Sequence, residues 1–333
     1  MELLGRNRIM KEIEANLYCI ELPLPKNPLK SINSYVLKGS KRSLIIDTGM
    51  NRPECKDVLF PALKELGVDL AKTDLFITHL HADHFGLVGD LATDTSICYM
   101  GHLDAEIVKN RKHWEEFFKF FSENGFPEAV LKESLSRHPG VLYSPSRMPE
   151  ITPVKDGQKI EVGEFQLTCI ETPGHSPGHM CLYDENKKIL FSGDHILFDI
   201  TPNISCWQEM ADSLRSYLSS LDKVAGLEVT NVYPAHRRAL PGLKSRVDEL
   251  KTHHRHRLDE ALAALEDGDM TAYEVAPYIT WRIEYTNWKD FPIAQQFFAV
   301  GETLAHLHYL ENEGSVKSYK EDGQVYFGLA ESA

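Results

Sequence analysis

Three histidines and one aspartate lie within six residues, in the segment 78–84 (THLHADH). The segment follows a short apolar run that indicates a buried strand. His79 and His81 are two residues apart, so they leave the end of a strand on the same side. Asp83 and His84 come from the turn that follows and can face a second point nearby. A histidine-rich surface loop is the alternative, but the pattern favours a metal site with room for two ions.

Three further candidate ligands each lie at the end of their own predicted strand. They are His175 after residues 164–171, Asp194 after residues 188–191 and His236 after residues 229–233. Strand ends of a layered sheet can converge on one edge, where α/β folds commonly place their sites. The resulting five histidines and two aspartates are too many for one tetrahedral ion. They suit two divalent metal ions that share one carboxylate, with Zn²⁺ first and Fe or Mn as alternatives.

Alternating strands and helices must position these residues, which predicts an α/β fold. Periodicity, turn residues and helix-stop residues give the boundaries. The predicted strands are residues 13–24, 32–37, 43–47, 74–77, 160–162, 164–170, 180–183, 188–191 and 229–233, and the predicted helices are residues 53–66 and 207–224.

Four polar residues near the candidate ligands have two interpretations each. Asp47 ends an apolar strand, where it could brace a ligating histidine or simply form a turn. His179 either supports a ligand or is structural. His195 and Asn203 follow Asp194 in the chain. They are predicted to contact substrate, with loop packing as an equal alternative.

Residues 101–145 are crowded with aromatic side chains and interrupt the strand pattern. A helix is expected over residues 102–124. We interpret the segment as an insertion whose helix pair packs on its own small core. The alternative is a cap that shapes a substrate pocket or a subunit contact. We also expect the segment to border the metal site.

The chain divides near residue 240 into a catalytic region (1–240) and a C-terminal region (241–333). The C-terminal region begins with a long helix, residues 241–266, which carries a cluster of histidines and arginines at 253–257. We interpret that cluster as a solvated helix face. Thr271 is the predicted N-cap of a short helix. A helix at 297–311 and a hairpin of residues 315–319 and 324–327 follow, which is the element order of a small winged-helix module.

Composition argues against several classes of function. The 333 residues carry a formal net charge of −13, which disfavours nucleic acid as a partner. No stretch is apolar enough to span a membrane and the N-terminus has no secretory pattern, so a cytoplasmic protein without a membrane partner is expected. The six cysteines are scattered without a C-x-x-C pair and read as mostly buried, reduced thiols.

The combined motifs closely resemble those of the metallo-β-lactamase-fold hydrolases over residues 13–240. The H-x-H-x-D-H signature lies at residues 79–84, T-P-G-H at 172–175 and G-D at 193–194, and a strand-end histidine follows at 236. The resemblance implies a four-layer αββα sandwich. It also implies a first metal held by His79, His81 and His175, a second held by Asp83, His84 and His236, and Asp194 as the bridge. The C-terminal region resembles the winged-helix appendage of a lactamase-like subgroup that includes an endoribonuclease.

Two features narrow the resemblance within the family. True β-lactamases of this fold are exported and commonly have a cysteine where Asp194 stands, so antibiotic hydrolysis is not expected. The flavo-diiron branch has a glutamate where this chain has His81. The set of candidate ligands instead resembles that of the glyoxalase II-like and RNA-processing branches.

The predicted activity is hydrolysis of a small-molecule ester, thioester or lactone. Two metal ions can bridge a water and make it an attacking hydroxide near neutral pH. Asp83 is then expected to relay the proton to the leaving group. The alternative is a metal-dependent endoribonuclease or phosphodiesterase, but from residue 251 on acids outnumber bases about twofold. A persulfide dioxygenase with one iron on His79, His175 and Asp194 is a further alternative. The winged module would serve packing or homodimer formation.

Overall fold

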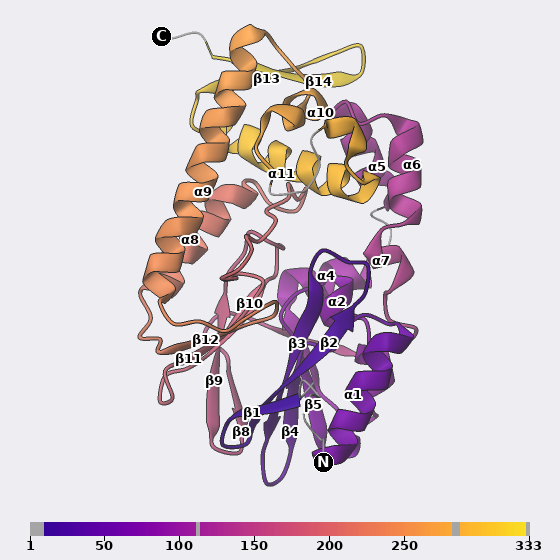
Figure 1. Cartoon of the computed structure of the whole chain (residues 1–333), viewed down its shortest axis with the longest axis vertical. Helices are drawn as coiled ribbons and strands as arrows, with labels where there is room; N and C mark the ends of the chain where they lie inside the picture. Colours follow the sequence, from indigo (N-terminus) through magenta and orange to yellow (C-terminus); the bar gives the residue numbers. More distant parts are fainter. Residues whose placement is uncertain (1–9, 111–113, 282–286, 331–333) are drawn as a thin grey trace, which may run out of the picture.

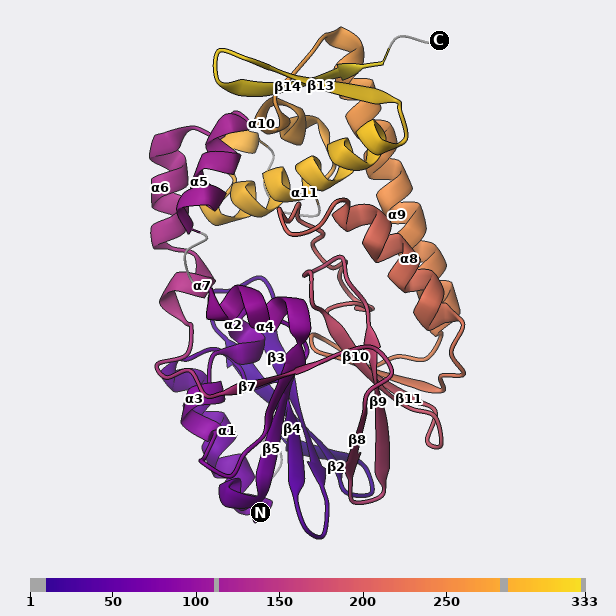
Figure 2. The ribbon, with the colours of Figure 1, turned by 180° about the vertical axis from the view of Figure 1, so that it is seen from behind.

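The protein folds around two β-sheets that lie face to face, with helices outside each sheet (Figure 1, Figure 2). The computed structural model describes residues 10–110, 114–281 and 287–330. Most predicted strands and helices of the first 240 residues are present. The additional strands β6 and β7, at Cys98–Gly101 and Ile151–Val154, were not predicted.

The first sheet has seven strands in the order β1-β2-β3-β4-β5-β6-β7. Strands β1 to β4 are antiparallel and β4 to β7 are parallel. Helices α1 to α4 follow its strands and their apolar residues join the same core. The bounds are β1 Met10–Glu14, β2 Leu17–Leu24, β3 Lys30–Lys38, β4 Ser43–Ile46, β5 Thr73–Ile77, α1 Pro53–Glu65, α2 Ala82–Phe85, α3 Val88–Leu91 and α4 His102–Lys109.

The second sheet has five strands in the order β12-β11-β10-β9-β8. Helices α8 and the first half of α9 share an apolar core with it. The bounds are β8 Lys159–Val162, β9 Phe165–Glu171, β10 Met180–Asp184, β11 Ile189–Gly193, β12 Asn231–Pro234, α8 Ser213–Ala225 and α9 Leu243–Ala264.

The alternation of side chains along the central strands produces the layers. In β4, Leu44 and Ile46 point into the core between the two sheets, while Ile45 points into the core beneath the helices. In β5, Phe76 faces the other sheet and its neighbours face the helices. Strands buried on both faces read as continuous apolar runs. The predicted four-layer αββα sandwich is therefore confirmed.

The C-terminal region consists of helices and a two-stranded sheet at one end of the sandwich (Figure 1). Helices α5 and α6 of the insert lie against it, and α7 follows them. The bounds are α5 Trp114–Glu123, α6 Glu128–Ser136, α7 Pro139–Leu142, α10 Ala272–Val275, α11 Ile293–Asn312, β13 Val316–Glu321 and β14 Gln324–Leu329. Thr271 caps α10 through a capping box with Glu274, as predicted.

The prediction that the insert packs on a core of its own is wrong. Phe121, Phe126 and Leu131 belong to one core with residues of α9, α10 and α11. The rings of Phe121 and Phe297 stack with their centroids 4.5 Å apart. The apolar faces of α5 and α6 are thus buried mainly by helices α9, α10 and α11, which begin more than 100 residues further along the chain.

Several predicted boundaries also need correction. Residues 13–24 form parts of two antiparallel strands, because Asn16 adopts a left-handed φ of 61° and turns the chain. The predicted helix over 207–224 begins only at Ser213, where the side chain of Asp212 caps the first turn. The predicted helix over 102–124 is two helices, and residues 111–113 lie outside the described residues.

The histidine and arginine cluster is only partly on a solvated face. Arg255 and His256 are exposed, but His254 and Arg257 are buried. Four of the six cysteines are buried, and all six are free thiols. Across the described ranges, no helix combines the length and apolar character needed to cross a bilayer.

Candidate metal centre

The seven candidate ligands meet at the edge of the sandwich that lies nearest the C-terminal region. Strands β5, β9, β11 and β12 all end there, and each is followed by one or more of the candidate residues. The resulting side chains form three overlapping groups in which the ligand atoms lie within 4.8 Å of one another: His79, His81 and His175; His79, His84 and Asp194; and Asp83, His84 and His236.

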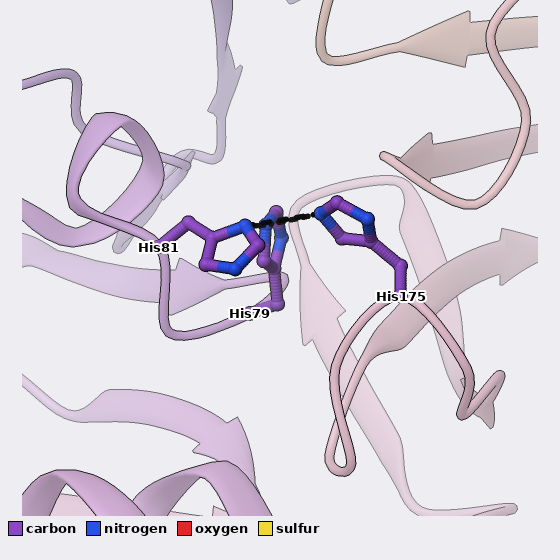
Figure 3. Close-up of side chains that lie close together, drawn as sticks. All are labelled: His79, His81 and His175. Atoms are coloured by element: carbon purple, nitrogen blue, oxygen red, sulfur yellow. Dashed lines mark hydrogen bonds between the residues drawn. The ribbon is translucent and has the colours of Figure 1, made fainter. Parts of the chain in front are cut away.

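The first group consists of three imidazoles that point at one another (Figure 3). His79 Nε2 lies 2.9 Å from His81 Nδ1 and 3.2 Å from His175 Nε2, and the last two atoms are 3.0 Å apart. Burial and the neighbouring imidazoles hold the pKa of His79 well below its usual value, and burial lowers the pKa of His81 to about 3. Neutral nitrogens that converge in this way present lone pairs to one point, which is the arrangement a metal ion requires.

The group of Asp83, His84 and His236, called the second group from here on, contains two imidazoles and a carboxylate. His236 Nε2 lies 3.3 Å from Asp83 Oδ2, and His84 Nε2 lies 3.8 Å from the same oxygen. All three residues are buried. They form a second point at which nitrogen and oxygen donors meet.

Asp194 lies between the two groups. Its Oδ2 is 3.5 Å from His175 Nε2 and 3.6 Å from His84 Nε2, while its Oδ1 is 3.5 Å from His236 Nε2. One carboxylate thus faces an imidazole of the first group and two of the second. This is the place that a bridging ligand would occupy.

The other ring nitrogens of His175 and His236 have fixed partners. The Nδ1 atoms of His175 and His236 each lie 2.7 Å from a backbone carbonyl oxygen, those of Asn203 and Ser31. A carbonyl only accepts, so each Nδ1 carries the proton and each Nε2 carries the lone pair. His84 Nε2 and His236 Nε2 are buried and have no hydrogen-bond partner among the described residues. The donor set therefore fits two divalent metal ions.

The electrostatics of the site agree with that fit. Burial raises the pKa of Asp83, but His84 and His236 lower it by more, so that the pKa lies at about 2. Burial likewise disfavours the charged form of His84, but Asp47, Asp83 and Asp194 keep its pKa well above the usual value. The buried carboxylates thus stabilise positive charge at this point, which is the charge that a metal ion supplies.

Comparison with known proteins identifies the family of this chain. Residues 27–236 match the family model described as the metallo-beta-lactamase superfamily. The chain belongs to the metallo-β-lactamase superfamily. Residues 258–330 match a second model, described as the metallo-beta-lactamase-like C-terminal domain.

Three similar proteins illustrate how far the likeness extends. A probable metallo-hydrolase of Bacillus subtilis is 27% identical over 308 residues, which cover 88% of this chain and 92% of that protein. A metallo-beta-lactamase family protein of Thermus thermophilus has a TM-score of 0.81 at 28% identity, covering 96% of this chain and all of that one. An atrochrysone carboxyl ACP thioesterase of Emericella nidulans is 27% identical over 224 residues, 67% of this chain but only 57% of that protein.

Asp47 braces the histidine loop of this superfamily member. Its Oδ2 lies 2.7 Å from His84 Nδ1, and its Oδ1 accepts a hydrogen bond of 2.8 Å from the backbone N–H of Thr78. Asp47 also has a left-handed φ of 58°. Both interpretations from the sequence therefore apply, because the residue turns the chain after β4 and its carboxylate orients a candidate ligand.

His179 supports the backbone of Asp194 through a hydrogen bond. The backbone N–H of Asp194 donates to His179 Nε2 over 3.1 Å, and His179 Nδ1 lies 2.8 Å from the hydroxyl of Thr172. A Cβ on Gly193 would lie 2.6 Å from His179 Nε2, and Gly193 has a φ of 51°. A glycine is thus required for the turn that presents Asp194 to the metal centre.

Asp104 is a structural brace that sequence reasoning missed. Its fully buried carboxylate accepts hydrogen bonds from the backbone N–H groups of Leu80 and Gly178, over 2.9 and 2.6 Å, and from the hydroxyl of Ser176 over 2.7 Å. It therefore ties the loop of His79 and His81 to the loop of His175. Asp104 follows the end of β6, so recognising that short strand would have indicated it.

The stability contributed by Asp104 is expected to depend on pH. Burial raises its pKa to about 6, so the folded chain holds the proton more tightly than the unfolded chain does. This residue thus favours folding at low pH and loses that contribution as the pH rises through about 6. The unfolding free energy of wild type minus that of Asp104→Asn should fall by roughly 3 kcal/mol between pH 4 and pH 7.

Urea unfolding of the two metal-free proteins at several pH values measures this difference. The exposed Asp94→Asn exchange is the control for a general effect of removing a carboxylate. A difference between wild type and Asp104→Asn that stays constant from pH 4 to pH 7 contradicts the prediction.

The structure does not support direct substrate contact by the two residues predicted for that role. His195 is fully buried, and its ring packs against those of His179 and Tyr217. The side-chain amide nitrogen of Asn203 donates to Glu302 and to a backbone carbonyl of α11. The loop-packing alternative therefore describes both residues better, because burial or an existing hydrogen bond occupies each side chain.

Trp207 is a second residue that the sequence did not indicate. Its indole N–H donates to the backbone carbonyl of His175 over 3.0 Å. Its ring lies nearly parallel to that of His81, with centroids 6.1 Å apart. Trp207 is half-buried, and its ring places an aromatic surface beside the first group of histidines.

Proposed function

We propose that this chain is a dinuclear metal-dependent hydrolase of small acyl compounds. Thioesters are the preferred candidate substrates, and esters and lactones are the other candidates. The observation that carries the proposal is the position of Asp194 between the two groups of candidate ligands. A site for a single iron would use only His79, His175 and Asp194. The convergence of Asp83, His84 and His236 on a second point favours two ions instead.

The chemistry of hydrolysis supports this assignment of roles. When two divalent ions are bound, they supply an activated water and polarise the acyl carbonyl. Asp83 remains a carboxylate because its pKa is held at about 2, so its oxygens can accept the proton of that water and pass it to the leaving group. A thiolate is a good leaving group, and Trp207 provides an apolar surface next to the first group.

The relatives support a thioester substrate. One of the proteins that this chain resembles is named a thioesterase for an acyl carrier protein substrate, although the match covers little more than half of that protein. From residue 251 on, acidic residues outnumber basic ones about twofold, which disfavours phosphate binding by the C-terminal region. We therefore rank thioesters above phosphodiesters as candidate substrates.

Metal analysis combined with a substrate panel tests the proposal. We expect about two metal ions per purified chain and hydrolysis of acyl thioesters that stops when the metal is removed by a chelator and returns with Zn²⁺. The panel includes lactones, a phosphodiester and single-stranded RNA. Cleavage of RNA without thioester hydrolysis, or one iron per chain with oxygen uptake, contradicts the proposal.

A further inference from the structure

A short loop joins the metal centre to the C-terminal region. This loop, residues 203–206, lies directly against helix α11. The amide nitrogen of Asn203 donates to the backbone carbonyl of Phe298 over 3.2 Å, and the backbone N–H of Cys206 donates to the carbonyl of Gly301 over 2.9 Å. A Cβ on Gly301 would lie 2.8 Å from the hydroxyl of Ser205. The loop and the helix therefore fit closely at this point.

The same loop orients a candidate metal ligand. The backbone carbonyl oxygen of Asn203 accepts the hydrogen bond of His175 Nδ1 over 2.7 Å. That bond fixes the tautomer of His175 and turns its Nε2 toward His79 and His81. The position of one carbonyl group thus sets the position of one ligand nitrogen.

The side chain of Asn203 is held by a buried ion pair. Its amide nitrogen donates to Glu302 Oε2 over 2.7 Å, and the amide oxygen accepts from the hydroxyl of Ser205 over 2.8 Å. Glu302 and Arg257 form an ion pair in which the residues are only 3% and 6% exposed. The guanidinium of Arg257 also lies 4.3 Å from the ring centroid of Trp281. Residues of α9 and α11 therefore fix the place of Asn203.

Glu302 also lies near His253 and His254, at distances that could hold a metal ion. However, its two carboxylate oxygens are already engaged by Arg257 and Asn203. A guanidinium beside the carboxylate supplies the positive charge that an ion would otherwise bring. The group is therefore better suited to hold a neighbouring residue than to bind a metal.

We propose that Asn203, held in place by the Glu302–Arg257 pair, is a positioning residue for His175. Through this contact, the C-terminal helices set the metal affinity of the first group. This inference rests on the proposed metal centre. It assigns the C-terminal region a role in the site itself and replaces the predicted contact between Asn203 and substrate.

The exchange Asn203→Ala tests this proposal, because it removes the amide but keeps the backbone carbonyl. We expect the affinity for one of two Zn²⁺ ions to fall about 10- to 100-fold and the affinity for the other to stay unchanged. Competition between the metal-free protein and a chromophoric chelator measures both affinities. The visible absorption of the Co²⁺-loaded protein reports the altered ligand geometry. Asn186→Ala, an exposed asparagine exchanged in the same way, is the matched control.

A second variant covers the case in which Asn203→Ala does not fold. Ser205→Ala removes a single hydrogen bond to the Asn203 amide, so we expect a loss of about 3-fold for the same ion. If Asn203 were only structural, the urea stability of the metal-free variant would fall while the Zn²⁺ affinities stayed as in wild type. Wild-type affinities in the folded variants overturn the proposal.

These measurements separate the inference from the proposed function because no substrate is present. If wild type hydrolyses no acyl compound and Asn203→Ala still weakens one Zn²⁺, the proposed function is wrong and the positioning role holds. If wild type hydrolyses thioesters and Asn203→Ala binds both ions normally, the positioning role is wrong and the function holds.

Discussion

Exchange of Asp194 for alanine is expected to lower kcat/KM for a thioester by roughly 10³-fold, or about 4 kcal/mol of transition-state stabilisation. Among the described residues, the Asp194 carboxylate faces both His175 and the pair His84 and His236. Without it, the second point retains one carboxylate and two imidazoles, and the ligand shared by the two points is lost. We therefore expect the variant to retain about one metal ion per chain.

Steady-state kinetics and elemental mass spectrometry of the same preparation measure both effects. The exchange Asp267→Ala is the matched control, because that aspartate is exposed in the short 3-10 helix that follows α9. The control should keep wild-type activity and metal content. Full turnover of Asp194→Ala with both ions retained contradicts the bridging role.

Exchange of Arg257 for methionine is expected to lower the unfolding free energy by about 3–5 kcal/mol, because it leaves the Glu302 carboxylate buried without its partner. Glu302 is only 3% exposed and Arg257 only 6%, so the pair is shielded from solvent between α9 and α11. Adding Glu302→Gln should recover most of the loss, since a neutral amide can still accept the hydrogen bond from Asn203.

Urea unfolding of the metal-free proteins compares the single and double variants. Arg255→Met is the matched control, because Arg255 lies on the exposed side of the same helix. Its effect should stay within about 0.5 kcal/mol. The prediction is wrong if Arg257→Met is no less stable than Arg255→Met, or if the double variant is less stable than the single one.

The amino-acid sequence by itself determined the sandwich and the residues that meet at its edge. The alternation of buried side chains in strands such as β4 and β5 is a local pattern, and so is the placement of a histidine or aspartate directly after a strand. The turn residues between β3 and β4 and the cap at Thr271 are likewise local. Such patterns are legible because the side chains involved are neighbours in the chain.

Only the tertiary structure decided what surrounds and orients the metal centre. Asp104, Asn203 and Trp207 act on loops that lie 24, 28 and 32 residues away in the sequence, and the local sequence around each residue does not reveal that partner. Similarly, Arg255 and Arg257 are two residues apart on one helix, yet one is exposed and the other buried. Which face of a helix is buried depends on the partner that covers it, and here that partner is α11, about 45 residues further along the chain.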